Sequence, residues 1–313
     1  MRRDASFVVG IWLLSRAVIL VSMLVIAPTL PQPADGHVAA RSWSTFLYAD
    51  GALYQSIVLD GYQYEKDRGT HPAYFPLYPL VAAPFVRFAH IPFAIVGPLL
   101  NGAAFLLALL ALFAWTRARH GPAAARWTIA TAAFLPLSIY GTLAYTEGLF
   151  LLLSTLALWS FERDRFAGAA VWGALASATR FPGLALMPAF ALEAVLQKRS
   201  RGAWIAALCA CAGTLAYALF CWRSFGDPFA FVHAQIAWRG PLTVRFADWE
   251  YMVAILLGTV GPHWWPYQIA IVALSALWWL KRGSFSDAGN FVCGLLLGLA
   301  EAALWFTSQW DLL

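Results

Sequence analysis

Four ionisable side chains lie where the sequence predicts the ends of helices. Asp50 and Glu147 each begin an apolar helical pattern, Arg180 follows another in "ASATRFPG", and His71 opens "HPAYFPLYP". A carboxylate near a bilayer surface is partly desolvated, which raises its pKa towards the range of a general base. Arginine binds phosphate through forked donors, and histidine can offer phosphate a proton or a positive charge. The four residues are therefore candidates for a base and for ligands of a phosphate.

These residue types also have purely structural explanations. Asp50 can cap the helix it begins, and Glu147 can do the same because an acid is favourable at a helix N-terminus. Arg180 can form an ion pair with either acid, which would satisfy a charge at the membrane boundary. The spacing alone leaves these alternatives open.

The segment "HPAYFPLYP" combines three prolines with Tyr74, Phe75 and Tyr78. Its prolines prevent an ordinary helix and stiffen a chain that returns to the membrane. Its aromatic rings are typical of an interfacial belt, so a structural role competes with a binding role. Further along, "GDPFAFVHAQIAW" predicts a turn and a helix that carries His233 and Gln235.

The elements that position these residues are membrane helices. The 313-residue chain is 61% hydrophobic and only 12% charged, whereas soluble domains are about 45–50% apolar and about 25% charged. The composition therefore predicts an all-α polytopic membrane protein. We expect a first helix near 7–27, retained rather than cleaved, followed by apolar segments near 91–115, 125–144, 147–161, 165–180, 183–197, 203–222, 264–280 and 287–307.

The basic residues predict the orientation of these helices. With the N-terminus in the cytoplasm, five clusters fall on the cytoplasmic side in turn, as the positive-inside rule requires. The net charge of +5 is explained in this way, without a nucleic-acid partner. The clusters are Arg2/Arg3, Arg117/Arg119/Arg126, Arg163/Arg165, Lys198/Arg199/Arg201 and Lys281/Arg282.

This orientation places the candidate residues on the non-cytoplasmic face. We expect one transmembrane domain, 1–313, with a first outer loop at 28–84 and a second large outer loop at 223–263. The segment 251–261 is expected to be short and re-entrant or interfacial, because a full span would move Lys281 and Arg282 outside.

Taken together, the polar segments resemble the PIG-V-like mannosyltransferase family, which contains GPI mannosyltransferase 2 and bacterial relatives. The family belongs to the GT-C superfamily of membrane glycosyltransferases. Ala49 stands where the family usually has Trp before the loop acid, and nothing after Trp265 matches the family's "RY" element. The elements that carry the resemblance are Asp50, Gly61/Tyr62, "YFPLYP" at 74–79, "YTEGLF" at 145–150, "ATRFPG" at 178–183 and Gly226–Gln235.

The resemblance implies a GT-C-like bundle of about nine spans in a bacterial plasma membrane. It also implies transfer of mannose, with inversion, from a polyprenyl-phosphate donor to a glycan or glycolipid acceptor. Asp50 would be the general base. The donor's phosphate and sugar would be bound by Arg180, His71, Glu147, Tyr74, Phe75, Tyr78 and Gln235.

Two other classes stay open at this stage. A transporter or flippase of a lipid-linked saccharide would carry charges near mid-membrane and paired broken helices. A catalytically silent subunit would keep the fold, and the unmatched C-terminal element favours it. Some GT-C enzymes use a divalent metal, but the chain has no DxD pair, so we expect no metal or other cofactor.

Overall fold

The computed structural model describes residues 2–29, 41–65 and 71–239. In this part of the chain the protein is all-helical, with 83% helix and no strand. By length and composition, three of its helical stretches could cross a membrane: Asp4–Thr29, Phe93–Phe134 and Arg201–Phe225. The prediction of about nine spans stays a prediction, because the segments 251–261, 264–280 and 287–307 lie outside the described residues.

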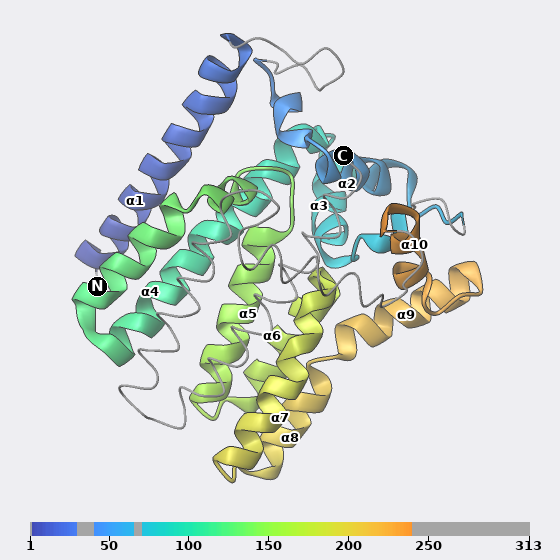
Figure 1. The fold of residues 1–313 in the computed structure, drawn as a ribbon. Helices are drawn as coiled ribbons and strands as arrows, with labels where there is room; N and C mark the ends of the chain where they lie inside the picture. Colours follow the sequence, from blue (N-terminus) through green and yellow to red (C-terminus); the bar gives the residue numbers. More distant parts are fainter. Residues whose placement is uncertain (1, 30–40, 66–70, 240–313) are drawn as a thin grey trace, which may run out of the picture.

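The first two long stretches form one layer of the fold. Helix α1 (Arg2–Val21) continues through two short turns to Thr29, and α4 (Phe93–Phe134) contains a non-helical residue, Gly121, with φ 83° and ψ 175°. The chain reverses there, so the helix expected near 91–115 is the first arm of α4 (Figure 1). The helix expected near 125–144 is shorter than expected: the second arm ends at Phe134 and a 3-10 turn, Pro136–Gly141, follows, because Pro136 disfavours the helical conformation in the residue before it. Both arms bury side chains against α1, in a cluster that includes Val8, Phe105 and Ile129.

The next five helices pack into a second layer through small residues. A Cβ on Gly213 would lie 2.0 Å from the backbone oxygen of Ala174, so this contact between α9 and α6 requires glycine. Close approach of helix backbones through Gly and Ala is typical of membrane helix packing. The helices are α5 (Glu147–Glu162), α6 (Phe166–Thr179), α7 (Leu186–Leu196), α8 (Arg201–Cys209) and α9 (Ala212–Phe225).

The first outer loop folds into short helices, as expected. They are η3 (Trp43–Leu47), α2 (Asp50–Asp60), η4 (His71–Ala73) and α3 (Leu77–Arg87). The loop packs on the bundle through a buried cluster that joins Tyr54 and Tyr78 to Phe93 of α4 and Ala144. The described part of the second outer loop forms α10 (Ala230–Arg239), which lies beside η4 and α9.

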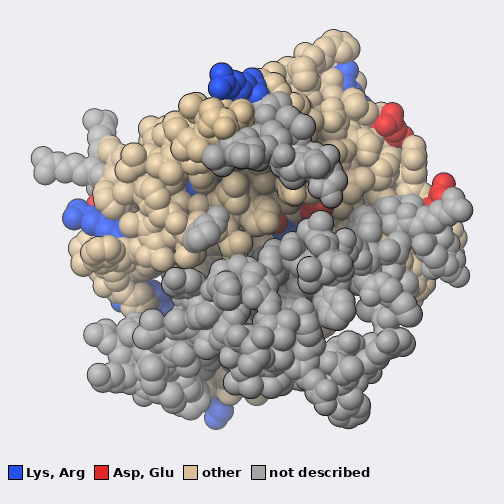
Figure 2. All heavy atoms as spheres, turned by 45° about the horizontal axis from the view of Figure 1, so that its top comes forward, with Lys and Arg blue, Asp and Glu red and all other residues tan. Residues whose placement is uncertain are grey.

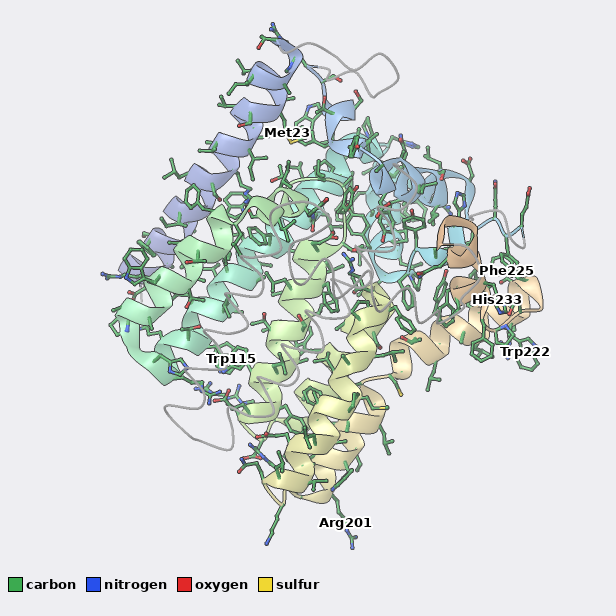
Figure 3. All side chains as sticks on the ribbon, in the orientation of Figure 1. Met23, Trp115, Arg201, Trp222, Phe225 and His233 are labelled. Atoms are coloured by element: carbon green, nitrogen blue, oxygen red, sulfur yellow. The ribbon has the colours of Figure 1, made fainter. Side chains whose placement is uncertain are left out.

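The candidate residues and the basic clusters occupy opposite ends of the bundle. Met23, in the π-helical turn that follows α1, packs against the cluster of Phe46, Leu143 and Tyr145, whereas Trp115 and Arg201 lie at the other end (Figure 3). Uncharged residues dominate the described surface seen in Figure 2, with a few acidic and basic atoms near the centre of that view. The fold thus separates two groups of charges along the bundle.

Candidate active site

Asp50 is the first residue of α2, and the residue before it is strained. Ala49 has φ 48° and ψ −111°, a backbone conformation that costs a non-glycine residue about 1–3 kcal/mol. Strained residues of this kind cluster at functional sites, where the surrounding structure holds them in place. Ala49 occupies the N-cap position of α2 and has no side chain that can cap it, so Asp50 is the first helical residue rather than the cap.

Two tyrosines from different parts of the chain lie at Asp50. The Tyr74 hydroxyl donates a hydrogen bond to Asp50 Oδ1 over 3.0 Å, and the Tyr145 side chain lies close enough to Asp50 for the backbone and charge of Asp50 to influence the pKa of Tyr145. Burial raises the pKa of the Asp50 carboxyl, while the Tyr74 bond and the charge of Arg180 act in the opposite direction. The result is a carboxyl group whose pKa is shifted upward, as a general base near neutral pH needs.

Glu147 and Arg180 form an ion pair across two helices. Glu147 begins α5, and Arg180 ends α6 in an extended conformation. Arg180 also donates to the Thr146 hydroxyl over 3.4 Å. Of the two partners that the sequence offered Arg180, the structure pairs it directly with Glu147.

Tyrosine rings connect the base and the ion pair. The ring of Tyr54 lies 5.1 Å from the ring of Tyr74 and 5.1 Å from that of Tyr78, in edge-to-face geometry. Burial raises the pKa of Tyr54 well above its usual value, so its hydroxyl stays protonated. The charges of Asp50 and Arg180 also act on Tyr54, in opposite directions. A carboxyl group, a cation and protonated phenols thus meet where α2, α5 and α6 begin or end.

Three of the predicted site residues lie in other surroundings. Phe75 is buried against the rings of Phe181, Tyr217 and Phe231. Phe181 follows Arg180 directly in the sequence, so this aromatic cluster still borders the site.

His71 takes part in the internal structure of the first outer loop. Its Nε2 lies 2.9 Å from the Ser56 hydroxyl, and its Nδ1 is 3.2 Å from both the Gln63 amide nitrogen and the Gly61 carbonyl oxygen. Burial lowers the pKa of His71, which disfavours its charged form. These contacts weaken the prediction of a phosphate ligand and favour the structural alternative.

Gln235 is half-buried on α10, one turn beyond Phe231. Within the described ranges, no hydrogen bond joins its side chain to Asp50, Glu147 or Arg180. The nearby acid, Asp227, instead bonds to the Tyr64 hydroxyl at 2.7 Å and to His233 Nδ1 at 2.6 Å. These bonds join α10 to the first outer loop.

The sequence reasoning missed three residues that complete the site. Tyr54 follows Asp50 by four residues, and this helical spacing places both on one face of α2. Tyr145 and Thr146 directly precede Glu147 and contact the Asp50 backbone and Arg180. The spacing was a usable signal for Tyr54, whereas the other two contacts depend on the packing of α2 and α6 against the start of α5.

The site offers few ligands for a metal ion. Asp50 and Glu147 are its two carboxylates, and over residues 2–29, 41–65 and 71–239 no group of three His, Cys, Asp or Glu side chains is arranged to hold a metal. The contacts that the structure does show are hydrogen bonds and ion pairs of the kind that bind hydroxyl and phosphate groups.

Comparison with known proteins does not identify a family for this chain. No protein-family model, no curated protein and no solved structure matches it. What can be proposed about function therefore follows from the side chains of the site and from the motifs that they belong to.

Proposed function

We propose that the protein is a membrane glycosyltransferase that moves a sugar, mannose by resemblance, from a polyprenyl-phosphate donor to a hydroxyl acceptor. One observation carries this proposal. A carboxyl group with an upward-shifted pKa, Asp50, shares a tyrosine-lined site with a guanidinium, Arg180, at one end of an apolar helical bundle. Transfer from a sugar phosphate requires a base for the acceptor hydroxyl and a cation for the departing phosphate.

In the proposed reaction, Asp50 removes the proton from the acceptor hydroxyl as its oxygen attacks the anomeric carbon. The bond between that carbon and the phosphate oxygen breaks, and its electron pair leaves with the lipid phosphate. Attack opposite the leaving group inverts the configuration at the anomeric carbon. Tyr74 occupies Asp50 Oδ1, so Oδ2 is the oxygen that accepts the proton.

Arg180 is the ligand that we propose for the donor phosphate. Glu147 and Thr146 bind Nη1 of its guanidinium, which fixes the orientation of a planar group suited to a forked contact with phosphate. Tyr74, Tyr78 and the Phe75 cluster would shape the site for the sugar and the first lipid units. No nucleotide is involved, so no Gly-rich phosphate loop is required.

The proposal includes a place in the cell. A GT-C-like bundle of about nine spans, with a cytoplasmic N-terminus, would lie in a bacterial plasma membrane with this site on the outer face. The separation of the site from the basic clusters at the other end of the bundle supports this orientation. A partner subunit is compatible with it.

The transporter alternative requires a charge inside the membrane that can bind a passing ligand. Arg16, buried near the middle of the stretch Asp4–Thr29, is the candidate for such a charge. Its five N–H donors make five hydrogen bonds, to Ser15, Ala133, Thr142 and two oxygens of Ser138. Because these bonds use all its donors, Arg16 fixes the second arm of α4 and the segment after it, which favours the enzyme.

A transfer assay on the purified full chain tests the proposal. The chain is reconstituted in lipid nanodiscs with radiolabelled polyprenyl-phosphate mannose and with membrane glycolipids as acceptors. We expect label to move to a product, and Asp50→Asn to lower this rate by about 10³-fold. Asp60→Asn changes an exposed carboxylate on the same helix and should leave the rate unchanged.

The outcomes separate the alternatives. No transfer by the wild-type chain with any acceptor fraction contradicts the enzyme and favours a silent subunit. Movement of intact labelled lipid between leaflets of proteoliposomes, without transfer, indicates a flippase. Equal rates in Asp50→Asn and wild type contradict the assignment of the base.

A further inference from the structure

One irregular segment supplies residues that lie next to Asp50 and residues that lie next to Arg180. Residues 135–148, here called the connecting segment, comprise the link from the second arm of α4, with a single 3-10 turn at Pro136–Gly141, and the first two residues of α5. The segment carries Tyr145, which contacts Asp50, and Thr146 and Glu147, which contact Arg180. Backbone groups outside regular helices need other partners when they are buried. The position of the site therefore depends on what satisfies this segment.

Asn101 of α4 satisfies the connecting segment at three points. Its Nδ2 donates to the carbonyl oxygens of Tyr140 at 2.6 Å and Leu143 at 2.9 Å. Its Oδ1 accepts from the backbone N–H of Gly148 at 2.7 Å. Asn101 has no solvent exposure, so each bond would be costly to lose. The three anchor points lie on both sides of residues 145–147.

Packing leaves the anchored segment little freedom. A Cβ on Gly148 would lie 2.4 Å from the backbone oxygen of Asn101, and a Cβ on Gly97 would lie 2.8 Å from Ala144 Cβ. The start of α5 and residue 144 therefore lie directly against α4, one on each side of the site residues. A shift of the segment would require α4 to move with it.

We infer that Asn101 is the positioning residue of the site, because it fixes Glu147 against Arg180 and Tyr145 against Asp50 from a helix that contributes no side chain to the reaction. This inference rests on the proposed glycosyl transfer. On this inference, the buried side-chain amide of Asn101 sets the distance between the base, Asp50, and the cation that binds the phosphate, Arg180. A displacement of about 1 Å between reacting groups can cost about 10²-fold in rate.

Two measurements on the full chain test this role. Hydrogen exchange of the peptide that contains Gly148 reports the anchor directly, because the Gly148 amide is bonded to Asn101. We expect faster exchange in Asn101→Ala, together with about 10²-fold slower sugar transfer per folded molecule. Ser154→Ala is the control: Ser154 is buried on α5 but bonds only to its own helix, so both readouts should stay as in wild type.

A double-mutant cycle separates positioning from general destabilisation. If Asn101 acts through Glu147, Asn101→Ala should slow transfer far less in a Glu147→Gln background than in wild type. Independent, multiplicative losses would contradict the inference. If Asn101→Ala does not fold, Asn101→Asp replaces it, because it keeps the acceptor for Gly148 and removes the NH2 group that donates to both carbonyls.

The two proposals fail in different ways. Absence of transfer by the wild-type chain contradicts the proposed function, while the exchange of Gly148 still decides whether Asn101 anchors the segment. Unchanged exchange in Asn101→Ala overturns the anchor. Faster exchange with wild-type transfer shows that the anchor does not position the site, and this also overturns the inference.

Discussion

The two ends of the bundle use the same residue types in different ways. At the site end, the Glu147–Arg180 pair has side chains that are 27% and 22% exposed. At the other end, Arg199 and Glu193 are only 14% and 9% exposed, at 3.3 Å. The pair at the site end is thus more exposed to solvent than the pair at the other end. An ion pair alone therefore does not indicate function.

The partners of each arginine extend this contrast. Arg199 also contacts Asp164 at 2.6 Å and the carbonyl oxygens of Phe161 and Glu162, so it joins the ends of α5 and α7. Arg180 contacts side chains that begin α5 and lies within electrostatic reach of Asp50. Arg199 thus acts as a structural link between helices, while Arg180 is held beside a second acid.

The largest expected difference between the two ends is in transfer. Arg180→Gln removes the charge that would stabilise the departing phosphate, and should slow transfer by about 10²–10³-fold. Arg199→Gln should leave transfer per folded molecule unchanged. Rates are measured in the nanodisc assay after correction for folded protein. Equal losses in the two variants would show that the ends do not differ in function.

The effects on stability should have the opposite order: Arg199→Gln should destabilise the protein more than Arg180→Gln. Arg199→Gln leaves the buried Glu193 carboxylate without its cation and should lower the free energy of unfolding by about 3 kcal/mol. Arg180→Gln leaves Glu147 partly exposed and should cost about 1 kcal/mol. Denaturant unfolding in detergent measures both. A larger loss in Arg180→Gln would reverse the proposed roles.

The hydrogen bond from Tyr74 to Asp50 should affect how the rate of transfer depends on pH. This bond lowers the pKa of Asp50 against the larger effect of burial, so Tyr74→Phe should raise that pKa further. Because the base must be ionised, the acid limb of kcat/KM moves to higher pH. At high pH, where Asp50 is ionised in both proteins, the loss should stay below about tenfold.

Tyr62→Phe is the matched control for Tyr74→Phe. The Tyr62 hydroxyl bonds to the Tyr74 carbonyl oxygen at 2.8 Å, not to the carboxylate. In Tyr62→Phe, the acid limb of kcat/KM should therefore lie at the same pH as in the wild type. A profile that shifts equally in both variants would show that the loop, not the bond to Asp50, sets the pKa.

The smallest expected effect concerns backbone strain. At the end opposite the site, the positive-φ residues Asp164 and Lys198 each follow the C-cap residue of a helix, where left-handed residues commonly close a helix. Ala49 instead precedes one. Ala49→Gly should raise the free energy of unfolding by up to about 1 kcal/mol. Ala52→Gly, at an exposed position inside α2, should lower it by about 1 kcal/mol; the same sign in both would contradict strain at Ala49.

The sequence predicted the helices well and the contacts less well. The break at Gly121 and the end of α6 before Arg180 follow from apolar runs interrupted by polar or glycine residues. Residues 61–65 belong to the segment expected to form the first outer loop, yet Tyr62 donates a hydrogen bond to the Tyr74 carbonyl oxygen and Tyr64 donates one to Asp227. Loop composition predicts polarity, but it contains no information on which distant group a tyrosine will meet.

By itself, the sequence determined the helical class, the apolar stretches long enough for a membrane, and the presence of acids and bases at helix ends. These properties follow from local composition and periodicity. Only the tertiary structure decided that Arg180 pairs with Glu147, that Tyr74 holds Asp50, and that Asn101 fixes the connecting segment. Such choices depend on how helices far apart in the chain rotate and pack against one another, because each side chain can bond only with the groups that this packing brings within about 3 Å.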